Sequence, residues 1–459
     1  MNNVTTSRAV LGRLGFLLVS AGCAIGLGNV WRFPFTTGTH GGMVFVMVYI
    51  FFLCALLPVM IMEFAVGRAS RRNMGQALHV LEPQGTGWSR FGWISLAGSY
   101  LLMMFYTTVT GWMLIYCWQL ATGNLAGLDP SQVGAAFGSL LASPGLQILG
   151  MTVTVLLGFG ICAMGVQQGV ERVVKWMMAG LFILLALLVW QALLLPSAEE
   201  GVRFYLVPDW SQVEKVGLLK ICNAAMNQAF FALSVGIGAM TVFGSYQSKS
   251  RSLSGEAIWI TSLNTLTGIM AGLIIFPACF SFGVEPGAGP GLVFVTLPNI
   301  FNTMDGGRIW GTLFFIFLAF ASLSTVIAVF ENIISYSVDV WGMERHRAAM
   351  VHTAAMWLLS LPCALGFNVL DWIQPLGAGS TILDLEDFIL SNNILPLGSL
   401  LFILFCTRRR GWGWNSFLAE ANEGEGLKFP NALRFYLTWI LPAMIVIVLL
   451  VGYVDKFFS

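Results

Sequence analysis

The chain has 459 residues, of which 57% are hydrophobic and only 10% are charged, and its formal net charge is +1. Soluble domains carry about 25% charged residues, so this composition excludes an ordinary soluble protein. The nearly neutral balance gives no reason to expect a nucleic-acid partner. Apolar segments of about 20 residues, each long enough to cross a bilayer, recur along the whole chain. The sequence therefore predicts an all-α, polytopic membrane protein whose surroundings are a lipid bilayer.

Eleven membrane helices are predicted in chain order, and no soluble domain interrupts them. Their approximate spans are 11–36, 41–70, 90–122, 145–164, 168–196, 217–247, 254–282, 307–340, 348–367, 377–406 and 431–456. A loop rich in Gly and Pro starts at Glu285, and its apolar continuation over 292–304 is predicted to fold back toward the membrane as a lid. We therefore expect one transmembrane domain over 1–459.

Two of these apolar segments are interrupted at their centres by glycine-rich stretches, 20–29 and 231–238. Glycine weakens a helix, and unpaired backbone groups at membrane depth cost several kcal/mol each unless something polar satisfies them. Paired breaks of this kind indicate an ion and substrate site at the midplane of a secondary transporter. The alternative is that the glycines only allow helices to pack closely. Asn29 and Ser234, which lie in the two breaks, favour the first interpretation.

The positions of the two breaks also suggest two copies of a five-helix unit. Helices 1–5 (about 11–196) and helices 6–10 (about 217–406) each open with a broken helix, and an extra helix follows at about 431–456. The orientation follows from the positive-inside rule, which places the N-terminus in the cytoplasm and the C-terminus outside. Seventeen of the 23 Lys and Arg residues flank the side predicted to be cytoplasmic: Arg8, Arg13, Arg68, Arg71, Arg72, Arg90, Arg172, Lys175, Lys249, Arg251, Arg345, Arg347, Arg408, Arg409, Arg410, Lys428 and Arg434.

Several strings of residues resemble the neurotransmitter:sodium symporters, and within them the bacterial amino acid branch. They are Arg13-Leu-Gly-Phe16, Gly26-Leu-Gly-Asn-Val-Trp-Arg-Phe-Pro34, Gly41-Gly42, Glu63-Phe-Ala-Val-Gly-Arg68, Phe230-Phe-Ala-Leu-Ser-Val-Gly236, Gly289-Pro-Gly-Leu-Val-Phe294 and Leu383-Asp-Leu-Glu-Asp387. The resemblance covers essentially the whole chain. It implies an inverted five-helix repeat that binds sodium and substrate between broken helices 1 and 6. The implied function is sodium-coupled symport of neutral hydrophobic amino acids by alternating access.

The resemblance implies one complete sodium site. Its ligands are the carbonyl oxygens of Gly22, Ile25 and Ala321 and the hydroxyls of Ser324 and Thr325. Sodium is a hard cation that prefers such oxygen ligands, and an unwound helix exposes the carbonyls that an intact helix uses itself. The alternative is that Ser324 and Thr325 only bond carbonyls in the preceding turn of their own helix.

A second sodium site implied by the resemblance lacks one ligand. It consists of the Ala24 carbonyl, the side chains of Asn29 and Asn264, position 232 and the substrate carboxylate. The family usually has Ser or Thr at position 232, whereas this chain has Ala232, whose methyl group cannot bind an ion. Gly268 stands where chloride-independent relatives commonly have an acid. Chloride dependence is not predicted. The number of bound sodium ions, one or two, is left open.

The substrate site implied by the resemblance has a polar end and an apolar end. Amides at Leu27 and Gly28, with the Tyr106 hydroxyl, would hold the carboxylate, because helix N-terminal ends favour anions. The carbonyls of Ala24, Phe231 and Ser234 would meet the ammonium group. The side-chain pocket would be Cys23, Leu102, Phe231, Ile237, Ser324 and Val329. Its apolar character predicts a hydrophobic neutral amino acid.

Gates are expected on both sides of this site. Arg32 lies within an apolar helix, where an unpaired charge is costly, and Asp387 matches its outer partner in the family. Phe231 would be the hydrophobic lid above the substrate. On the inner side Asp339 matches the family's acid, but its usual Arg falls on Ser7, and Arg8 is the expected replacement. Glu63 and Glu331 are interpreted as acids that pair with backbone breaks.

Three other functions are alternatives to sodium-coupled symport. A membrane enzyme needs a nucleophile–base pair or a metal cluster, and neither is found; the eight cysteines, expected to be buried free thiols, lack metal-site spacing. A non-transporting amino acid sensor and a transporter coupled to protons or to one sodium ion remain alternatives. The expected location is the cell (inner) membrane, as a monomer or homodimer.

Overall fold

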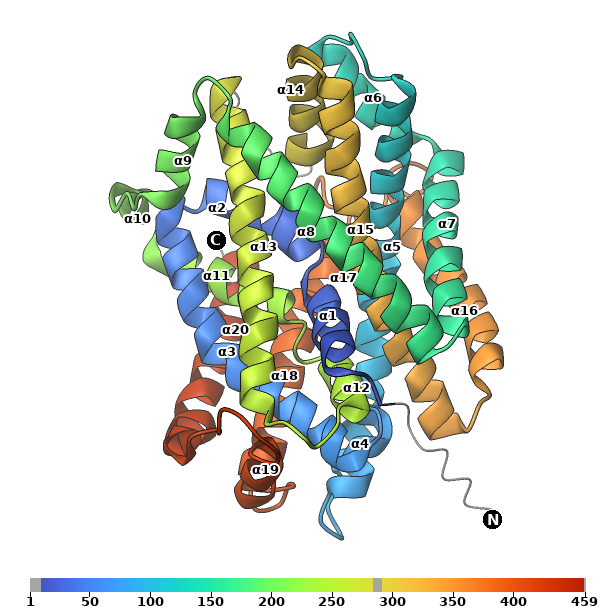
Figure 1. The fold of residues 1–459 in the computed structure, drawn as a ribbon, viewed down its shortest axis with the longest axis vertical. Helices are drawn as coiled ribbons and strands as arrows, with labels where there is room; N and C mark the ends of the chain where they lie inside the picture. The colour runs from blue at the N-terminus through green and yellow to red at the C-terminus, as the bar shows by residue number, and fades with distance from the viewer. Residues whose placement is uncertain (1–9, 284–290, 458–459) are drawn as a thin grey trace.

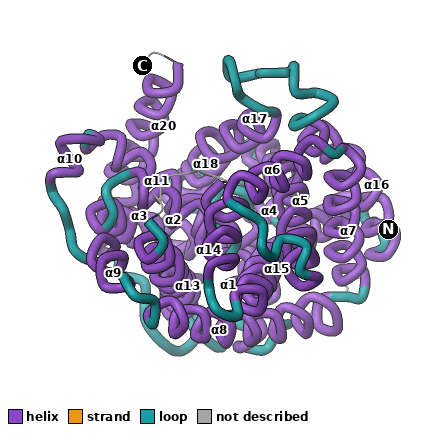
Figure 2. Tube along the Cα trace, turned by 90° about the horizontal axis from the view of Figure 1, so that it is seen from above, coloured by secondary structure: helices purple, strands orange, loops and turns teal. Residues whose placement is uncertain are grey.

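The computed structural model of the chain describes residues 10–283 and 291–457. Within those ranges the fold is a bundle of helices, with one isolated β-bridge between Arg251 and Glu425. Most long helices run roughly along one direction in Figure 1. Seen from above in Figure 2, helices fill the cross-section and loops are confined to the connections.

Nine of the described helical spans are long and apolar enough to cross a membrane, and a bent pair near the N-terminus makes ten. The helices are α1 (Arg13–Ala24), α2 (Phe33–Thr39), α3 (Met43–Ser70), α4 (Met74–Leu81), α5 (Trp93–Thr122), α6 (Pro130–Ala142), α7 (Pro144–Ala163), α8 (Arg172–Leu193), α9 (Ala198–Leu206), α10 (Ser211–Val216), α11 (Leu218–Leu233), α12 (Ala239–Tyr246), α13 (Leu253–Ser281), α14 (Leu297–Thr303), α15 (Gly307–Trp341), α16 (Arg345–Leu365), α17 (Ile382–Ile389), α18 (Leu395–Thr407), α19 (Trp414–Ala421) and α20 (Leu441–Phe457). Short 3₁₀ or π turns, η1 (Gly28–Arg32) to η7 (Tyr436–Ile440), join or extend several of them.

The predicted spans agree with these helices to within a few residues at most ends. The largest difference is at 377–406, where α17 begins only at Ile382 after a Gly-rich loop. The predicted helix over 217–247 is divided into α11 and α12, of 16 and 8 residues, and neither is long enough to cross the bilayer by itself. The tally of eleven crossings therefore remains a prediction, while the all-helical fold is confirmed.

Two elements are interrupted where the glycines predicted a break. The axis bends by 53° between α1 and the segment from Gly28 to Thr39. The second break separates α11 from α12 at residues 234–238. Long intact helices lie around the breaks. α15 packs along α5, and α3 packs along both α11 and α12. This scaffold fixes the broken elements near the centre of the bundle.

Several short helices were not predicted from the sequence. α4 and α19 lie at the end of the bundle near the N-terminus, and α6, α9 and α14 lie at the opposite end (Figure 1). At the first end the buried Arg68 of α3 donates from Nε to Glu420 of α19 over 2.7 Å. The segment 292–304, predicted to fold back as a lid, forms η4 (Leu292–Thr296) and α14, while residues 285–290 of that loop lie outside the described residues.

Candidate functional site

The two breaks meet each other at the centre of the bundle. α11 ends at Leu233, and Ser234 then adopts a left-handed conformation with φ of +51°, which is unusual for a residue other than Gly. From this position the Ser234 hydroxyl donates to the carbonyl of Cys23 over 3.1 Å. Strained backbone of this kind persists where the surroundings enforce it, often at functional sites. The break in α11 is therefore held directly against the break in α1.

Glu63 and Glu331 were both predicted to pair with backbone breaks, and this is confirmed for Glu63 but wrong for Glu331. The Glu63 carboxylate accepts the backbone N–H of Gly236 over 2.5 Å, within the α11–α12 break. Gly236 has φ of +98°, and a Cβ there would lie 2.2 Å from the carbonyl oxygen of Leu395, so only glycine fits. Glu331 instead accepts the Tyr246 hydroxyl over 2.6 Å and Arg345 Nη1 over 3.0 Å, so this acid pairs with side chains.

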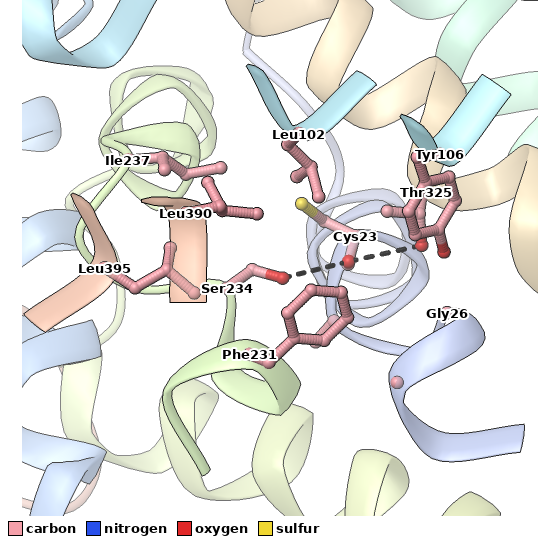
Figure 3. A pocket seen from close by; sticks show the side chains of 12 residues that line it. Cys23, Gly26, Leu102, Tyr106, Phe231, Ser234, Ile237, Thr325, Leu390 and Leu395 are labelled. Atoms are coloured by element: carbon pink, nitrogen blue, oxygen red, sulfur yellow. Dashed lines mark hydrogen bonds between the residues drawn. The ribbon is translucent and has the colours of Figure 1, made fainter. Parts of the chain in front are cut away.

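A pocket lies between the two breaks, and Figure 3 shows its lining. Of the eleven residues predicted to bind substrate, eight line it: Cys23, Ala24, Gly28, Leu102, Tyr106, Phe231, Ser234 and Ile237. The lining also includes Gly26, which was not predicted as a site residue, and Thr325, which was predicted only as a sodium ligand. Leu390 and Leu395 complete the lining, and neither was predicted as a site residue. They come from η5 (Leu390–Ile394) and α18. No pattern in the sequence indicates that these two elements lie next to the breaks.

The other three predicted residues lie beside the pocket rather than on its wall. Leu27 contributes its backbone amide, which donates to the Tyr106 hydroxyl over 2.8 Å. Ser324 belongs to a cluster of oxygens below the pocket, and Val329 is buried one turn further along α15. Because a carboxylate accepts hydrogen bonds from amides and phenols, the Leu27–Tyr106 pair is chemically suited to hold one.

The first oxygen cluster consists of the five predicted ligands, and all of them lie together. Thr325 Oγ1 is 3.1 Å from the Gly22 carbonyl oxygen and 3.5 Å from those of Ile25 and Ala321. Ser324 Oγ is 3.1 Å from the Gly22 oxygen and 2.9 Å from that of Ala321. A hydroxyl has one proton to donate, so these two cannot satisfy every surrounding carbonyl at once. Such an excess of acceptor oxygens in a buried site fits a hard cation.

The second cluster surrounds Asn29 and is smaller. Asn29 Nδ2 donates to Asn264 Oδ1, and it lies 3.4 Å from the Ala24 carbonyl oxygen. Asn29 Oδ1 and Asn264 Nδ2 are buried and without a hydrogen-bond partner among the described residues. A half-turn of the Asn29 amide would exchange its nitrogen for its oxygen and bring three oxygens together. Ala232 is fully buried and adds no side-chain oxygen.

The predicted pair of charges, Arg32 and Asp387, joins η1 of the first broken element to α17. Arg32 Nη1 donates to Asp387 Oδ1 over 3.1 Å and to the Ser391 hydroxyl over 3.0 Å. The Arg32 guanidinium also lies 5.1 Å from the centre of the Phe231 ring, in cation–π geometry. These contacts place the charged pair next to Phe231, an aromatic ring that lines the pocket.

Asp339, the acid predicted for the inner gate, has a partner that the sequence did not predict. Arg72 Nη1 lies 3.6 Å from Asp339 Oδ1, and the backbone N–H of Asn73 donates to Asp339 Oδ2 over 2.8 Å. Both come from the turn between α3 and α4. Arg8, the predicted partner, lies outside the described residues. The two adjacent arginines, Arg71 and Arg72, are the feature of the sequence that could have indicated a cation near Asp339.

The family model described as "Sodium:neurotransmitter symporter family" matches residues 8–132 and 135–456. The chain belongs to that family. It is 35% identical to the "uncharacterized sodium-dependent transporter YhdH" of Bacillus subtilis, over 95% of this chain and 96% of that protein. A similar relative from Haemophilus influenzae is 30% identical over the same shares. The crystal structure of MhsT in complex with L-phenylalanine matches with a TM-score of 0.88 and 36% identity, covering 97% of this chain and 99% of that one.

As a member of the sodium:neurotransmitter symporter family, the chain is a sodium-coupled symporter of a small molecule and a multi-pass membrane protein, not an enzyme. Among the described residues no group of three or more His, Cys, Asp and Glu side chains could hold a metal ion. All eight cysteines are free, but the expectation that all are buried is wrong, because Cys54 is exposed and Cys117 and Cys222 are half-buried. These three lie in apolar membrane segments, where facing lipid costs a thiol little.

Proposed function

We propose that this symporter carries a neutral, hydrophobic amino acid together with sodium by alternating access. The observation that supports this best is the pocket between the two breaks, with an amide and a phenol at one end and apolar side chains at the other. No Asp or Glu lines the described pocket, which disfavours a second positive charge on the substrate. The match to a structure that holds L-phenylalanine agrees with this substrate class.

In this proposal the first oxygen cluster holds the coupling sodium ion. The cluster joins the break after α1 to α15, so an ion there would stabilise one arrangement of the broken helix against the scaffold. Every ligand is neutral, and sodium requires no carboxylate when carbonyls and hydroxyls are numerous enough. Empty, the cluster would leave several carbonyls sharing two protons, which weakens the contact between Gly22 and Thr325.

The second cluster would bind sodium only together with the substrate. Its side-chain ligands are Asn29 and Asn264, and the amino acid's carboxylate would supply the missing charge and oxygen. This arrangement couples ion and substrate because each completes the other's site. With Ala232 in place of a hydroxyl, we propose a weaker second site and no requirement for chloride.

Two sets of contacts would serve as gates. Arg32, Asp387 and Phe231 would close the outer path over the pocket. Arg72 and Asp339 would act at the inner end, where α12 is also tied to α15 by Tyr246 and Glu331. The arginine-rich connections share this inner end, which supports an orientation with the N-terminus in the cytoplasm of a cell (inner) membrane.

The proposal is tested by uptake of labelled amino acids into proteoliposomes. Internal and external sodium and pH are varied separately, with a panel of neutral, cationic and acidic amino acids. We expect uptake of apolar members only, driven by an inward sodium gradient. A Hill coefficient for sodium of about two indicates both sites, and about one indicates only the Gly22–Thr325 site. Uptake that follows a proton gradient and ignores sodium would contradict the coupling.

Pocket size gives a second test within the same assay. Ile237 lines the pocket and is fully buried. Replacement Ile237→Phe narrows the pocket, so uptake of phenylalanine should fall more than uptake of alanine. The size preference should change by about ten- to a hundredfold, as expected for one to several methylenes in an apolar pocket. Leu101→Phe, at a half-buried position next to the lining residue Leu102, is the control.

A further inference from the structure

Glu386 is a buried acid that the proposed transport cycle does not use. It lies in α17, directly before the gate residue Asp387, and is only 3% exposed. Both of its carboxylate oxygens lack a hydrogen-bond partner among the described residues. Asp387, by contrast, has a side chain that is 34% exposed and paired with Arg32. Adjacent residues of one helix therefore place one acid in a charged contact and the other in the interior.

The described elements that pack most closely against α17 are α5, η5 and α16, and none of them pairs a cation with Glu386. η1 also reaches α17, but its Arg32 is bonded to Asp387 and Ser391. Neither α5 nor η5 contains Asp, Glu, Lys or Arg. The basic residues of α16 lie at its first turns, Arg345 to Arg347, whereas the part next to Glu386 holds the Cys363 thiol. His352 of α16 is bonded to Tyr100 and Ser337 instead.

The polar groups nearest to Glu386 are neutral. The Cys363 thiol lies beside its carboxyl group, and the Thr108 hydroxyl of α5 lies beside Cys363. Thr108 Oγ1 is buried and also lacks a partner. The other acids of α17 are engaged elsewhere: Asp384 accepts the Thr381 N–H over 2.7 Å, and Asp387 accepts from Arg32.

An ionised carboxylate in these surroundings would be an unpaired buried charge. That state is far more costly than a neutral acid, so a group so placed takes up a proton. A protonated carboxyl can also donate a hydrogen bond, and the Cys363 sulfur beside it is a weak acceptor. The burial depends on α17 staying packed against α5 and α16, and α17 also carries the acid that binds Arg32.

We propose that Glu386 is a proton-binding site, protonated while the Arg32–Asp387 contact is closed and able to release its proton when α17 opens to water. Protonation then stabilises the closed outer gate, and a rise in external pH favours opening. The inference goes beyond the proposed function, because no substrate or sodium ligand takes part in it. Glu386 acts here as a positioning residue for α17.

Infrared difference spectroscopy of the purified full-length transporter tests the protonation directly. A buried protonated carboxyl has a C=O stretching band above the amide I region that an ionised carboxylate lacks. We expect such a band at neutral pH in the wild type, its loss in Glu386→Gln, and its retention in Asp371→Asn. Asp371 is an exposed acid of the α16–α17 connection and serves as the control. If the C=O stretching band at neutral pH is the same in Glu386→Gln as in the wild type, the proposal is overturned.

A second variant keeps the test decisive if Glu386→Gln does not fold. Cys363→Ser replaces the thiol beside Glu386 with a stronger hydrogen-bonding hydroxyl of similar size. The C=O band should move to lower frequency in this variant. A band that keeps its position would mean that it belongs to another acid.

The link to the outer gate is tested by binding of L-phenylalanine in saturating sodium at a series of pH values. In the wild type and in Asp371→Asn, the apparent Kd should rise with pH by up to tenfold per pH unit. This rise is expected above the pH at which Glu386 loses its proton. The apparent Kd should be independent of pH in Glu386→Gln over the same range. The same pH dependence in all three proteins contradicts the link. If the wild type binds no neutral amino acid, the proposed function fails, while the infrared result still decides on the proton.

Discussion

The two oxygen clusters beside the break in α1 differ in how many protein oxygens they bring together. The first has five predicted ligands from α1, its break and α15, and each lies within 3.5 Å of another. The second has the Ala24 carbonyl and two Asn side chains, with a methyl group at Ala232. The first can surround a cation without help, whereas the second requires an additional oxygen.

This difference has a physical consequence for coupling. A site complete in itself can bind its ion before the substrate arrives and can prepare the broken helix for it. A site that needs the substrate carboxylate gains affinity only when both are present, so ion and substrate bind cooperatively.

Replacing Gly26 should have the largest effect, because it lies between the first cluster and the pocket. A Cβ at this position would come 2.3 Å from the Tyr106 hydroxyl and 2.5 Å from Thr325 Oγ1. We expect Gly26→Ala to abolish sodium-driven uptake while the protein remains folded enough to purify as a single species. Gly12→Ala, where a Cβ would meet nothing within 4 Å, is the control and should keep wild-type uptake. Normal uptake by Gly26→Ala would mean that these contacts are not needed.

Thr325→Val removes the hydroxyl shared by three carbonyls of the first cluster and keeps the side-chain volume. A hydrogen bond or ligand to a charged group contributes about 1.5–3 kcal/mol, so sodium affinity should fall about ten- to a hundredfold. Sodium binding can be measured by isothermal calorimetry without substrate. Thr154→Val is the matched control, because this buried Thr only bonds the Gly150 carbonyl four residues back, over 3.0 Å. Equal affinities in the two variants would remove Thr325 from the site.

Tyr106→Phe tests the substrate contact that lies between the clusters. It removes the hydroxyl that accepts the Leu27 amide over 2.8 Å. Loss of one such bond costs about 1–2 kcal/mol, so the affinity for a neutral amino acid should fall by roughly five- to thirtyfold. Sodium binding in the absence of substrate should change little, because the Tyr106 hydroxyl lies beside Thr325 but is not one of the predicted sodium ligands. Tyr116→Phe on the same helix is the control, because its buried hydroxyl has no partner among the described residues. A sodium affinity that falls with Tyr106→Phe would contradict a role confined to substrate.

Much of the fold was predictable because membrane helices are long and uniformly apolar. The spans 41–70, 254–282 and 307–340 differ from α3, α13 and α15 by no more than two residues at either end. The short helices α4, α9 and α19 were missed because they are not long enough to give a hydropathy signal and depend on tertiary contacts. The buried Arg68–Glu420 pair, which holds α19 against α3, joins residues 352 positions apart.

The same limit applies to the candidate site. Residues within the breaks, such as Ser234 and Asn29, can be recognised from the sequence because polar side chains are rare at membrane depth. Leu390 and Leu395 line the pocket but look like any other apolar membrane residues. Arg72 could not be paired with Asp339 from the sequence, because the contact depends on how the turn before α4 is folded. A single chain reveals unusual residues better than it reveals which ordinary ones meet.

The smallest expected effect comes from making the second cluster more like the first. Ala232→Ser introduces a hydroxyl at the position that the resemblance implies as a further ligand of the second site. A small side chain and a single added ligand should strengthen sodium binding in the presence of substrate by about three- to tenfold, the range for one net hydrogen bond. The Hill coefficient for sodium in uptake should also rise toward two. Ala229→Ser, at a fully buried position one turn earlier in α11, controls for the hydroxyl itself. If Ala232→Ser behaves like Ala229→Ser, a hydroxyl at position 232 is no ligand of the second cluster, and the methyl group is not what weakens that site.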